Sequence, residues 1–333
     1  MNTGYFVLGA ILLIAVTVDL LWTTLWVTKG AGPITSLVMK WLWRLLRRSA
    51  NRNSRFLTLI GPLVLSLGIL VWILLLWGGW TLIFASAETA LIDTLNRGPI
   101  SWSDRIYFTG FTVFTLGIGD FVPREGFWQL LSILATASGL VFITLAITYI
   151  LSVLGAVTQK RSFASNVNGL GTTSEEILRA SWDGNEFQGL DLPLNTFTTQ
   201  LNTLTINHNA YPILHYFYTQ ETDQAPTTSI AVLDETLTLL RFGVPEQDQP
   251  AKVIVKSARD SIHDYLELLH QSHVERADRT PPSPNLDSLR ERGIPTVSND
   301  EFNASLDELS ERRRTLLGLL KSDVRQWPSQ DEE

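Results

Sequence analysis

The segment RIYFTGFTVFTLGIGDFVP (residues 105–123) joins a short apolar stretch to a loop in which glycines alternate with larger residues. The apolar stretch is too short to cross a membrane, because a transmembrane helix needs about 20 residues. Ser101 and Asp104 precede it, and both residue types accept hydrogen bonds from the free N–H groups at a helix start. The sequence therefore predicts a half-crossing helix over 103–114, followed by irregular backbone over 115–120.

Long apolar runs flank this segment on both sides. They cover residues 5–28, 57–86 and 127–157, and each exceeds the roughly 18 residues that indicate a transmembrane helix. Buried helices of a soluble protein are the alternative, but three such runs in the first half of the chain favour a membrane protein. The first run has no basic residue before it and is too long for the apolar core of a cleaved signal peptide.

The charges divide the chain into two different halves. The first 159 residues carry a net charge of +4, whereas the remainder carries 16 Lys and Arg against 27 Asp and Glu, a net charge of −11. The acidic half argues against nucleic acid as a partner. Residues 29–55 hold seven basic residues and no acidic one, so we expect this segment in the cytoplasm. The N-terminus would then lie outside and the C-terminal half inside, in a plasma or inner membrane.

Irregular backbone at membrane depth leaves carbonyl groups that lipid cannot satisfy. It must therefore be buried in protein or line a water-filled path. Gly117 and Gly119 permit backbone angles that turn successive carbonyls toward one side. Such a row of oxygens can replace the hydration shell of a cation, and the partially negative end of the preceding half-helix favours a cation as well.

The peptide Thr-Leu-Gly-Ile-Gly-Asp (115–120) resembles the potassium-channel signature Thr-Val-Gly-Tyr-Gly-Asp, and also the filters of TWIK-type two-pore-domain channels. The resemblance covers residues 57–157 and implies an outer helix, a pore helix (103–114), a filter (115–120) and an inner helix (127–157). It implies a homotetramer, because one chain supplies one of the four filter segments. We therefore expect an α-helical membrane protein, a tetrameric pore-loop channel with three transmembrane helices and a mostly α-helical cytoplasmic domain.

The resemblance also implies roles for the filter residues. The backbone carbonyls of Thr115, Leu116, Gly117 and Ile118 would bind dehydrated K⁺ ions, with the Thr115 hydroxyl adding the innermost site. Gly119 would permit the outer turn, and Asp120 would hold the filter through hydrogen bonds. An aromatic residue is usual where this chain has Ile118. We expect packing of Phe111 and Phe114 to compensate, and this departure leaves the selectivity for K⁺ over Na⁺ open.

The inner helix offers candidates for a hinge and a gate. Gly139 lies where the inner helices of this family often carry a flexible glycine, although close helix packing is an equal alternative. Four aliphatic residues further along could close the pore by dewetting, or they could simply face lipid: Ile143, Ile147, Ile150 and Leu154.

Two further features of the membrane half have alternative interpretations. The stretch LVMKWLWRLLRR (37–48) is typical of a helix lying in the membrane interface, so the basic segment 40–55 could bind anionic lipid head groups. A basic loop that only sets the topology is the alternative. Asp19 lies within the first apolar run, and we favour a hydrogen-bonded tether to a neighbouring helix over a sensor.

The C-terminal half (159–333) shows helical patterns and no glycine-rich nucleotide fingerprint. We expect helices over 173–182, 194–205, 230–242 and 252–273, an exposed linker at 281–284, and one long amphipathic helix over 300–325. The apolar stripe of this last helix could form a coiled coil between subunits or pack in its own chain. His263, Glu267 and His270 share one helix face and form a weak candidate metal site.

These observations favour a K⁺-conducting channel with three parts: an N-terminal segment (1–56), a pore domain (57–158) and a regulatory or assembly domain (159–333) with an unidentified ligand. A weakly selective cation channel is the nearest alternative, because of Ile118. A non-conducting receptor or scaffold is another. No arrangement of nucleophile and base indicates an enzyme, and no cofactor is expected beyond K⁺ in the filter.

Overall fold

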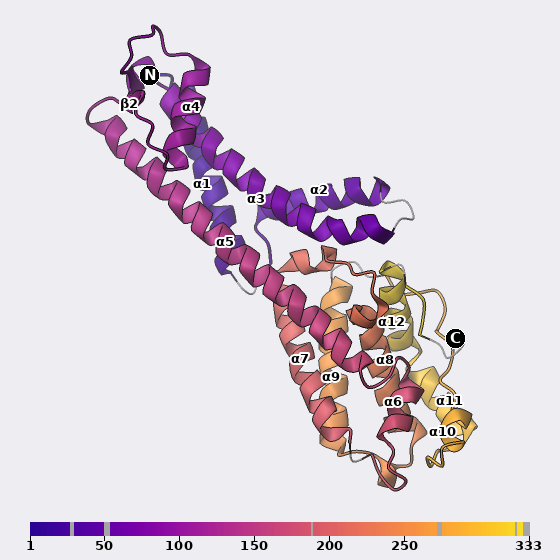
Figure 1. The fold of residues 1–333 in the computed structure, drawn as a ribbon. Coiled ribbons are helices and arrows are strands. Elements are labelled where there is room, and N and C mark those ends of the chain that lie inside the picture. Colours follow the sequence, from indigo (N-terminus) through magenta and orange to yellow (C-terminus); the bar gives the residue numbers. More distant parts are fainter. Residues whose placement is uncertain (27–29, 50–53, 188, 272–274, 324, 329–333) are drawn as a thin grey trace. The chain divides into compact units, whose positions relative to one another are not determined.

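The computed structural model describes residues 1–26, 30–49, 54–187, 189–271, 275–323 and 325–328. Within these ranges, the side chains of residues 43, 46–49, 54–57, 270 and 271 are outside the description. The chain forms two compact units (Figure 1). The first comprises Met1–Leu154 with Ala210–Tyr216, and the second comprises Gly155–Asn209 with Phe217–Glu333. The first unit thus includes both the N-terminal segment and most of the expected pore domain.

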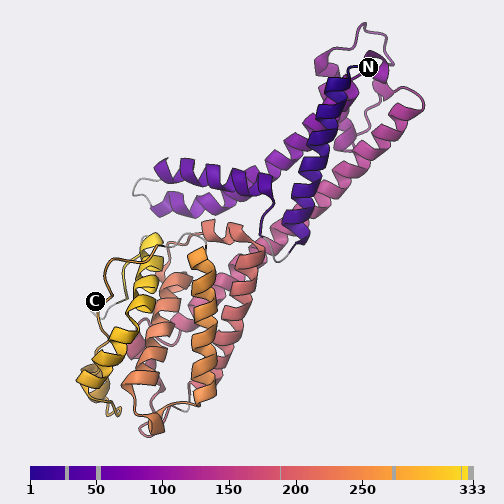
Figure 2. The ribbon, with the colours of Figure 1, turned by 180° about the vertical axis from the view of Figure 1, so that it is seen from behind.

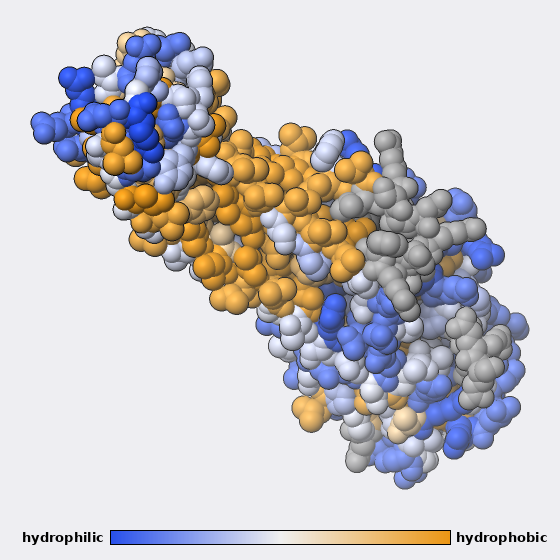
Figure 3. Space-filling model, turned by 45° about the horizontal axis from the view of Figure 1, so that its top comes forward, coloured by the Kyte–Doolittle hydropathy of each residue, from blue (hydrophilic) through white to orange (hydrophobic). Residues whose placement is uncertain are grey.

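Three helices of the described chain are long and apolar enough to cross a membrane. They are α1 (Thr3–Leu25), α3 (Ser54–Ala85) and α5 (Phe127–Asn168). Many of their large apolar side chains are exposed in the single chain, and a broad hydrophobic surface covers this part of the molecule (Figure 3). The protein is therefore a membrane protein built on α-helices, as the three apolar runs predicted.

The remaining elements of the first unit are short. The amphipathic helix α2 (Pro33–Ser49) precedes α3, and Figures 1 and 2 both show it beside the N-terminal part of α3. Between α3 and α5 lie the 3₁₀ turn η1 (Glu88–Ala90), strand β1 (Leu91–Asp93), helix α4 (Trp102–Val113) and strand β2 (Phe121–Pro123). The strands pair antiparallel, with Ile92 opposite Val122.

Three tryptophans of α3 tie this helix to three other elements. The indole N–H of Trp72 donates to the Asp19 carboxylate of α1 at 2.9 Å. Trp77 donates to the Ile106 carbonyl of α4 at 2.9 Å. Trp80 donates to the Ser138 hydroxyl of α5, also at 2.9 Å. Hydrogen bonds in an apolar environment fix the register of packed helices, so α3 sets the positions of α1, α4 and α5.

Asp19 is fully buried and holds the start of α2. Its carboxylate accepts the backbone N–H groups of Ile34 at 2.7 Å and Thr35 at 3.2 Å, and the Thr35 hydroxyl at 2.5 Å. The first N–H groups of a helix have no partner within the helix, and a carboxylate also suits the positive end of the helix dipole. Asp19 is therefore a tether between α1, α2 and α3, as the structural interpretation predicted.

Helix α2 presents an apolar face that its own chain does not cover. Leu37, Trp41 and Leu45 are at least half exposed, whereas Met39 and Leu42 are buried against the unit. This pattern is typical of a helix that lies in a membrane interface. The more C-terminal arginines of the basic segment 40–55 lie outside the described side chains.

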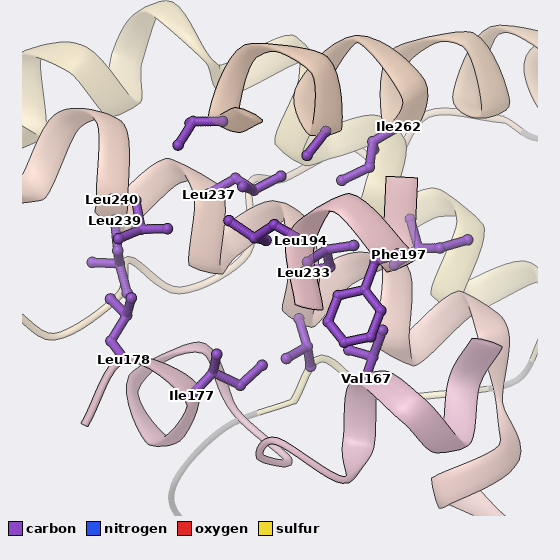
Figure 4. Close-up of a cluster of buried hydrophobic side chains, with 14 of the residues drawn as sticks. Val167, Ile177, Leu178, Leu194, Phe197, Leu233, Leu237, Leu239, Leu240 and Ile262 are labelled. Carbon is purple, nitrogen blue, oxygen red and sulfur yellow. The ribbon is translucent and has the colours of Figure 1, made fainter. Parts of the chain in front are cut away.

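The second unit is helical in every described element. Its helices after α5 are α6 (Ser174–Ser181), α7 (Asp191–Ala210), α8 (Pro226–Thr238), α9 (Lys252–Gln271), α10 (Asp287–Arg290), α11 (Asn299–Glu308) and α12 (Ser310–Ser322). Aliphatic and aromatic side chains from most of these helices share one core (Figure 4). Phe163 and Val167, from the last turns of α5, belong to that core.

The structure departs from the predicted helix limits at several points. Helix α7, expected over 194–205, runs from Asp191 to Ala210. The expected inner helix does not end at 157, because α5 continues without interruption to Asn168. Helix α8 ends at Thr238 and passes into a π-helical turn, η4 (Leu239–Gly243). The expected single helix over 300–325 is interrupted at Leu309, whose backbone angles (φ −91°, ψ 3°) separate α11 from α12.

The apolar stripe of 300–325 packs in its own chain. Phe302, Leu306, Leu316 and Leu320 are buried, and Arg313 within the stripe pairs with Glu235 of α8 at 3.0 Å. The intrachain alternative is therefore the correct one, and the stripe is not free to form a coiled coil. The expected linker at 281–284 is only partly exposed, because Pro281 is buried and the Pro282 carbonyl accepts a hydrogen bond from Arg313.

Candidate functional site: the loop between α4 and β2

Helix α4 begins with a capping box. The Ser101 hydroxyl accepts the Asp104 N–H at 3.3 Å, and the Asp104 carboxylate accepts the Ser101 N–H at 2.8 Å. The pKa of Asp104 is lowered, chiefly because the Ser101 side chain donates to its carboxylate. Reciprocal bonds of this type satisfy two of the free N–H groups at a helix start. The start of the short helix thus follows directly from the sequence Ser-Trp-Ser-Asp.

The chain leaves α4 through two tight backbone bonds. The Thr115 N–H donates to the Thr112 carbonyl at 3.1 Å, and the Leu116 N–H donates to the Phe111 carbonyl at 2.7 Å. These bonds fasten the beginning of the 115–120 loop to the last turn of α4. The loop then runs into β2 without forming a helix or strand of its own.

The loop backbone alternates between left-handed and ordinary conformations. Thr115 has φ +61°, Gly117 has φ +61° and Gly119 has φ +88°, while the residues between them do not have positive φ. In an extended strand successive carbonyls point to opposite sides, and reversing the hand at every second residue turns them toward a common side. Thr115 adopts this conformation despite its β-branched side chain. A positive φ is uncommon and strained for such a residue, and strained residues of this kind cluster at functional sites.

The loop is uncovered in the single chain. Residues 114–119 are all exposed. The solvent-exposed fraction is 67% for Leu116 and 53% for Ile118. Apolar and backbone groups of this kind are not left facing lipid, because lipid cannot satisfy the backbone. The exposure therefore marks the loop as a surface that other protein or an aqueous path would cover.

The C-terminal end of the loop is held by Asp120 and Arg97. The Asp120 carboxylate lies 3.4 Å from Arg97 Nη2 and accepts the Phe121 N–H at 3.1 Å. Its carbonyl accepts the Thr94 N–H at 3.0 Å and the Thr94 hydroxyl at 2.9 Å. The Arg97 guanidinium also stacks over the Phe121 ring, 4.5 Å from its centroid. Together these contacts fix the end of the loop to the turn after β1.

Arg97 is shared by a second carboxylate. Its Nη2 lies 3.1 Å from Asp93, and the Asp93 side chain also accepts the Arg97 and Leu95 backbone N–H groups. The side-chain bond from Arg97 is the main cause that lowers the pKa of Asp93 below its ordinary value. Because the Arg97 side chain is half exposed, the ion pair contributes little to stability, and its main effect is to position the turn after β1.

The two aromatic residues expected to support the loop have ring partners elsewhere in the unit. Phe111 is buried, and its ring lies edge-on to Tyr107 at 5.2 Å and to Phe108 at 5.3 Å. The Phe114 ring packs edge-on against Trp77 at 6.1 Å. These pairs anchor α4 within the unit, which fixes the helix end from which the loop starts.

Gly139 on α5 lies directly against the end of α4. A Cβ atom at this position would contact the Val113 carbonyl oxygen and would lie 2.9 Å from the Val113 carbonyl carbon. Only glycine permits this approach of two backbones. Close packing therefore accounts for Gly139, and the hinge role stays a prediction.

The gate candidates lie beside the buried face of α5. Ile147 and Leu154 are exposed, and Ile143 and Ile150 are half-buried. The same helix carries hydroxyl side chains on an adjacent face, where Thr144, Thr148 and Ser152 donate to the carbonyl four residues earlier. The single chain leaves both faces uncovered, so the gate assignment also stays a prediction.

The histidine cluster of α9 is only partly described. His263 and Glu267 are exposed, whereas the His270 side chain lies outside the described residues. Among the described side chains, no group of three His, Cys, Asp or Glu is placed to hold a metal ion. The metal site therefore stays a prediction that rests on spacing.

Sequence reasoning missed Arg97 and the three tryptophans of α3. The signal for Arg97 was weak, since only its spacing from Asp93 hinted at a pair. The tryptophans were visible as a group within one apolar run, and buried indoles usually donate to a partner. Their partners, however, lie up to 58 residues away.

Residues 69–156, from α3 to α5, match the family model described as "Ion channel". The chain belongs to this potassium-channel-like pore family, with an additional N-terminal helix and a helical C-terminal unit. It is 43% identical over 332 residues to the uncharacterized membrane protein YdjJ of Bacillus subtilis (strain 168), covering 100% of this chain and 97% of that protein. No solved structure matches the chain.

Proposed function

We propose that the protein is a K⁺-conducting channel formed by four copies of the chain. The observation that carries the proposal is the alternating backbone of 115–119, with positive φ at Thr115, Gly117 and Gly119. Four such loops around one axis give rings of carbonyl oxygens that replace the water shell of an ion. The ion-channel family and the uncovered loop support this assembly.

In the proposed mechanism, helix α4 is the pore helix and the loop is the filter. The C-terminal end of α4, at Val113 and the cap residue Phe114, directs the negative end of the helix dipole toward the cation path. Ions lose water at the carbonyls of 115–118, repel one another between adjacent sites, and rehydrate outside the filter. Asp120 and Arg97 hold the outer end of the filter at its working width. Transport is passive, and the protein carries out no enzymatic reaction.

A weakly selective cation channel is the second candidate. It is favoured by Ile118, whose side chain is 53% exposed and has no hydroxyl to donate to a neighbour. A filter without such a bond depends more strongly on the Arg97–Asp120 pair for its width. The two candidates differ in one measured quantity, the permeability ratio of K⁺ to Na⁺.

The membrane orientation follows from the basic segment that includes α2. We propose that this helix lies on the cytoplasmic side of the plasma membrane, with exposed Lys40 and Arg44 beside anionic head groups. The N-terminus and the loop after α4 then face outside. The second unit, with its excess of acidic residues, lies in the cytoplasm.

We further propose that the second unit biases the gate of the channel. The support is the continuity of α5, whose last turns place Phe163 and Val167 in the core of that unit. A ligand that shifts this core would move the helix directly. Deletion of residues 169–333 is expected to change the open probability and leave the permeability ratio unchanged.

The test of the function is a flux assay on purified protein in liposomes. A K⁺ gradient should drive uptake of a tracer cation, and a Na⁺ gradient of the same size should drive much less. Equal fluxes would favour the weakly selective candidate. A tetramer that carries neither ion under any condition would instead indicate a receptor or scaffold that retains the pore-like fold.

A further inference from the structure

The first unit contains a cavity that the residues of the 115–120 loop do not line. Its volume is about 840 Å³, within the range of small-molecule sites. It lies where the start of α1, the end of α3 and the start of α4 meet, and the Asn2 N–H closes one side by donating to the Ser86 carbonyl. The residues with chemistry to offer are Tyr5, Glu88, Thr89, Trp102 and Arg105.

Arg105 is the unusual residue of this cavity. It is only 8% exposed, and its Nη1 donates to the carbonyls of Ile100 at 2.5 Å and Ser101 at 3.2 Å. Its Nε is buried and has no hydrogen-bond acceptor. No described carboxylate forms an ion pair with it. A buried guanidinium without a counter-ion is costly, so an anion in the cavity would stabilise it.

Glu88 gives the cavity a second, opposite charge. It lines the same space, is exposed, and forms no ion pair with Arg105 among the described residues. A simple anion would be repelled by Glu88, and a simple cation by Arg105. A molecule that carries both charges satisfies both groups, since guanidinium binds phosphate or carboxylate and carboxylate binds an ammonium.

Two aromatic rings and the position of the cavity indicate the chemical class of the ligand more closely. Tyr5 and Trp102 lie edge to face, 5.5 Å apart, at the wall of the cavity. Such rings attract ammonium groups and are enriched where a membrane meets water. The cavity begins at Ala85, the last residue of the apolar helix α3, which is the level of lipid head groups.

We propose that this cavity binds a zwitterion in which an ammonium is linked to a phosphate, as in the head group of phosphatidylethanolamine. Arg105 binds the phosphate, Glu88 binds the ammonium, and Tyr5 and Trp102 flank it. The same chemistry occurs in a membrane lipid and in free phosphoethanolamine. The proposal does not depend on ion conduction, so its failure would leave the channel function untouched.

The experiment measures binding to the full chain in detergent by native mass spectrometry and thermal shift. The probes are dihexanoyl phosphatidylethanolamine, dihexanoyl phosphatidylglycerol, which lacks the ammonium, and free O-phosphoethanolamine. The variants are Arg105→Met and Glu88→Gln, with Arg124→Met as a control at an exposed arginine outside the cavity. We expect Arg105→Met to weaken binding of the ethanolamine probes at least about tenfold, and Glu88→Gln to abolish the preference for ethanolamine over glycerol.

Each outcome decides the proposal. Binding of the lipid alone assigns the cavity to a membrane head group, and binding of free phosphoethanolamine as well assigns it to the shared chemistry. Absence of binding by the unmodified chain overturns it. If Arg105→Met does not fold, Glu88→Gln decides, because Glu88 is exposed: an unchanged preference for ethanolamine would then overturn the site.

Discussion

Gly139 of α5 and Val113 of α4 approach so closely that a methyl group on Gly139 would lie 2.9 Å from the Val113 carbonyl carbon. The contact joins the helix that follows the loop to the helix that precedes it. The loop therefore starts from a point that α5 fixes, and any shift of α5 at this level must move the end of α4. This relationship makes Gly139 the position on α5 where a small change should have the largest effect.

Gly139→Ala should destabilise the membrane unit by about 1–3 kcal/mol, the usual cost of overpacking a rigid contact. The obstacle is backbone and not the end of a flexible side chain, so relaxation is limited. Thermal unfolding in detergent measures the effect. Gly155→Ala is the matched control, because the same helix offers open space around Gly155. Equal melting temperatures for the two variants would contradict the close packing.

Gly117→Ala should abolish K⁺ flux while leaving insertion into the membrane intact. No atom lies within 4 Å of the added Cβ, so the cause is the backbone, which has φ +61°. A left-handed alanine costs about 1–2 kcal/mol, and relaxation to negative φ would turn a carbonyl away from the common side. Gly78→Ala, in α3 with open space and no positive φ, is the control. Flux equal to that of the unmodified chain would argue strongly against the proposed filter.

Arg97→Gln should lower the K⁺ to Na⁺ permeability ratio more than it lowers stability. The variant removes the contacts of Arg97 with both Asp93 and Asp120, and ion pairs of a half-exposed arginine contribute little to stability. The end of the loop would lose the Arg97 part of its link to the turn after β1 and keep the two hydrogen bonds from Thr94 to the Asp120 carbonyl. Reversal potentials under bi-ionic conditions measure the ratio. Arg124→Gln serves as the control, since Arg124 is exposed and forms no ion pair among the described residues. A ratio that does not change would remove Arg97 from the account of selectivity.

Glu235→Gln should flatten the pH dependence of stability of the second unit. Burial raises the pKa of Glu235 to about 7, against the opposing effect of Arg313. Because the folded pKa is raised, this group contributes stability below its unfolded pKa of 4.5, and the contribution is lost as pH rises through about 7. The loss is at most about 3 kcal/mol.

Thermal unfolding of the full chain, followed by circular dichroism between pH 4.5 and 8, checks this effect. The variant cannot ionise, so its stability should vary less with pH, and its difference from the unmodified chain should be largest above pH 7, where Glu235 is ionised. Glu246→Gln is the control at a fully exposed carboxylate. A variant that retains the slope of the unmodified chain would contradict the role of Glu235.

The sequence predicted the local features of this fold well. The apolar runs, the Ser101–Asp104 cap and the break at 115–120 depend on neighbours in the chain, and each is set by length, helix capping or glycine content. The contacts that hold the helices of each unit together join residues far apart in sequence. Trp72 and Asp19 are 53 residues apart, and Arg313 and Glu235 are 78 apart. Such pairs depend on which helix faces pack together, and this packing cannot be predicted from a single sequence.

The helix limits show the same distinction in the second unit. The break at Leu309 was not visible because both sides carry good helix formers, and the break places Arg313 beside Glu235. The extension of α5 to Asn168 was missed because its polar continuation no longer resembled a membrane span. Phe163 and Val167 in that continuation are nevertheless buried.

Helix α5 runs without interruption from Phe127 to Asn168. Its first turns are apolar, and its last turns contribute Phe163 and Val167 to the core of the second unit. One helix thus carries both Gly139, which packs on α4, and two residues of the helical core. Substitutions around Phe163 and Val167 therefore act on the helix that carries Gly139 without any change in residues 115–120.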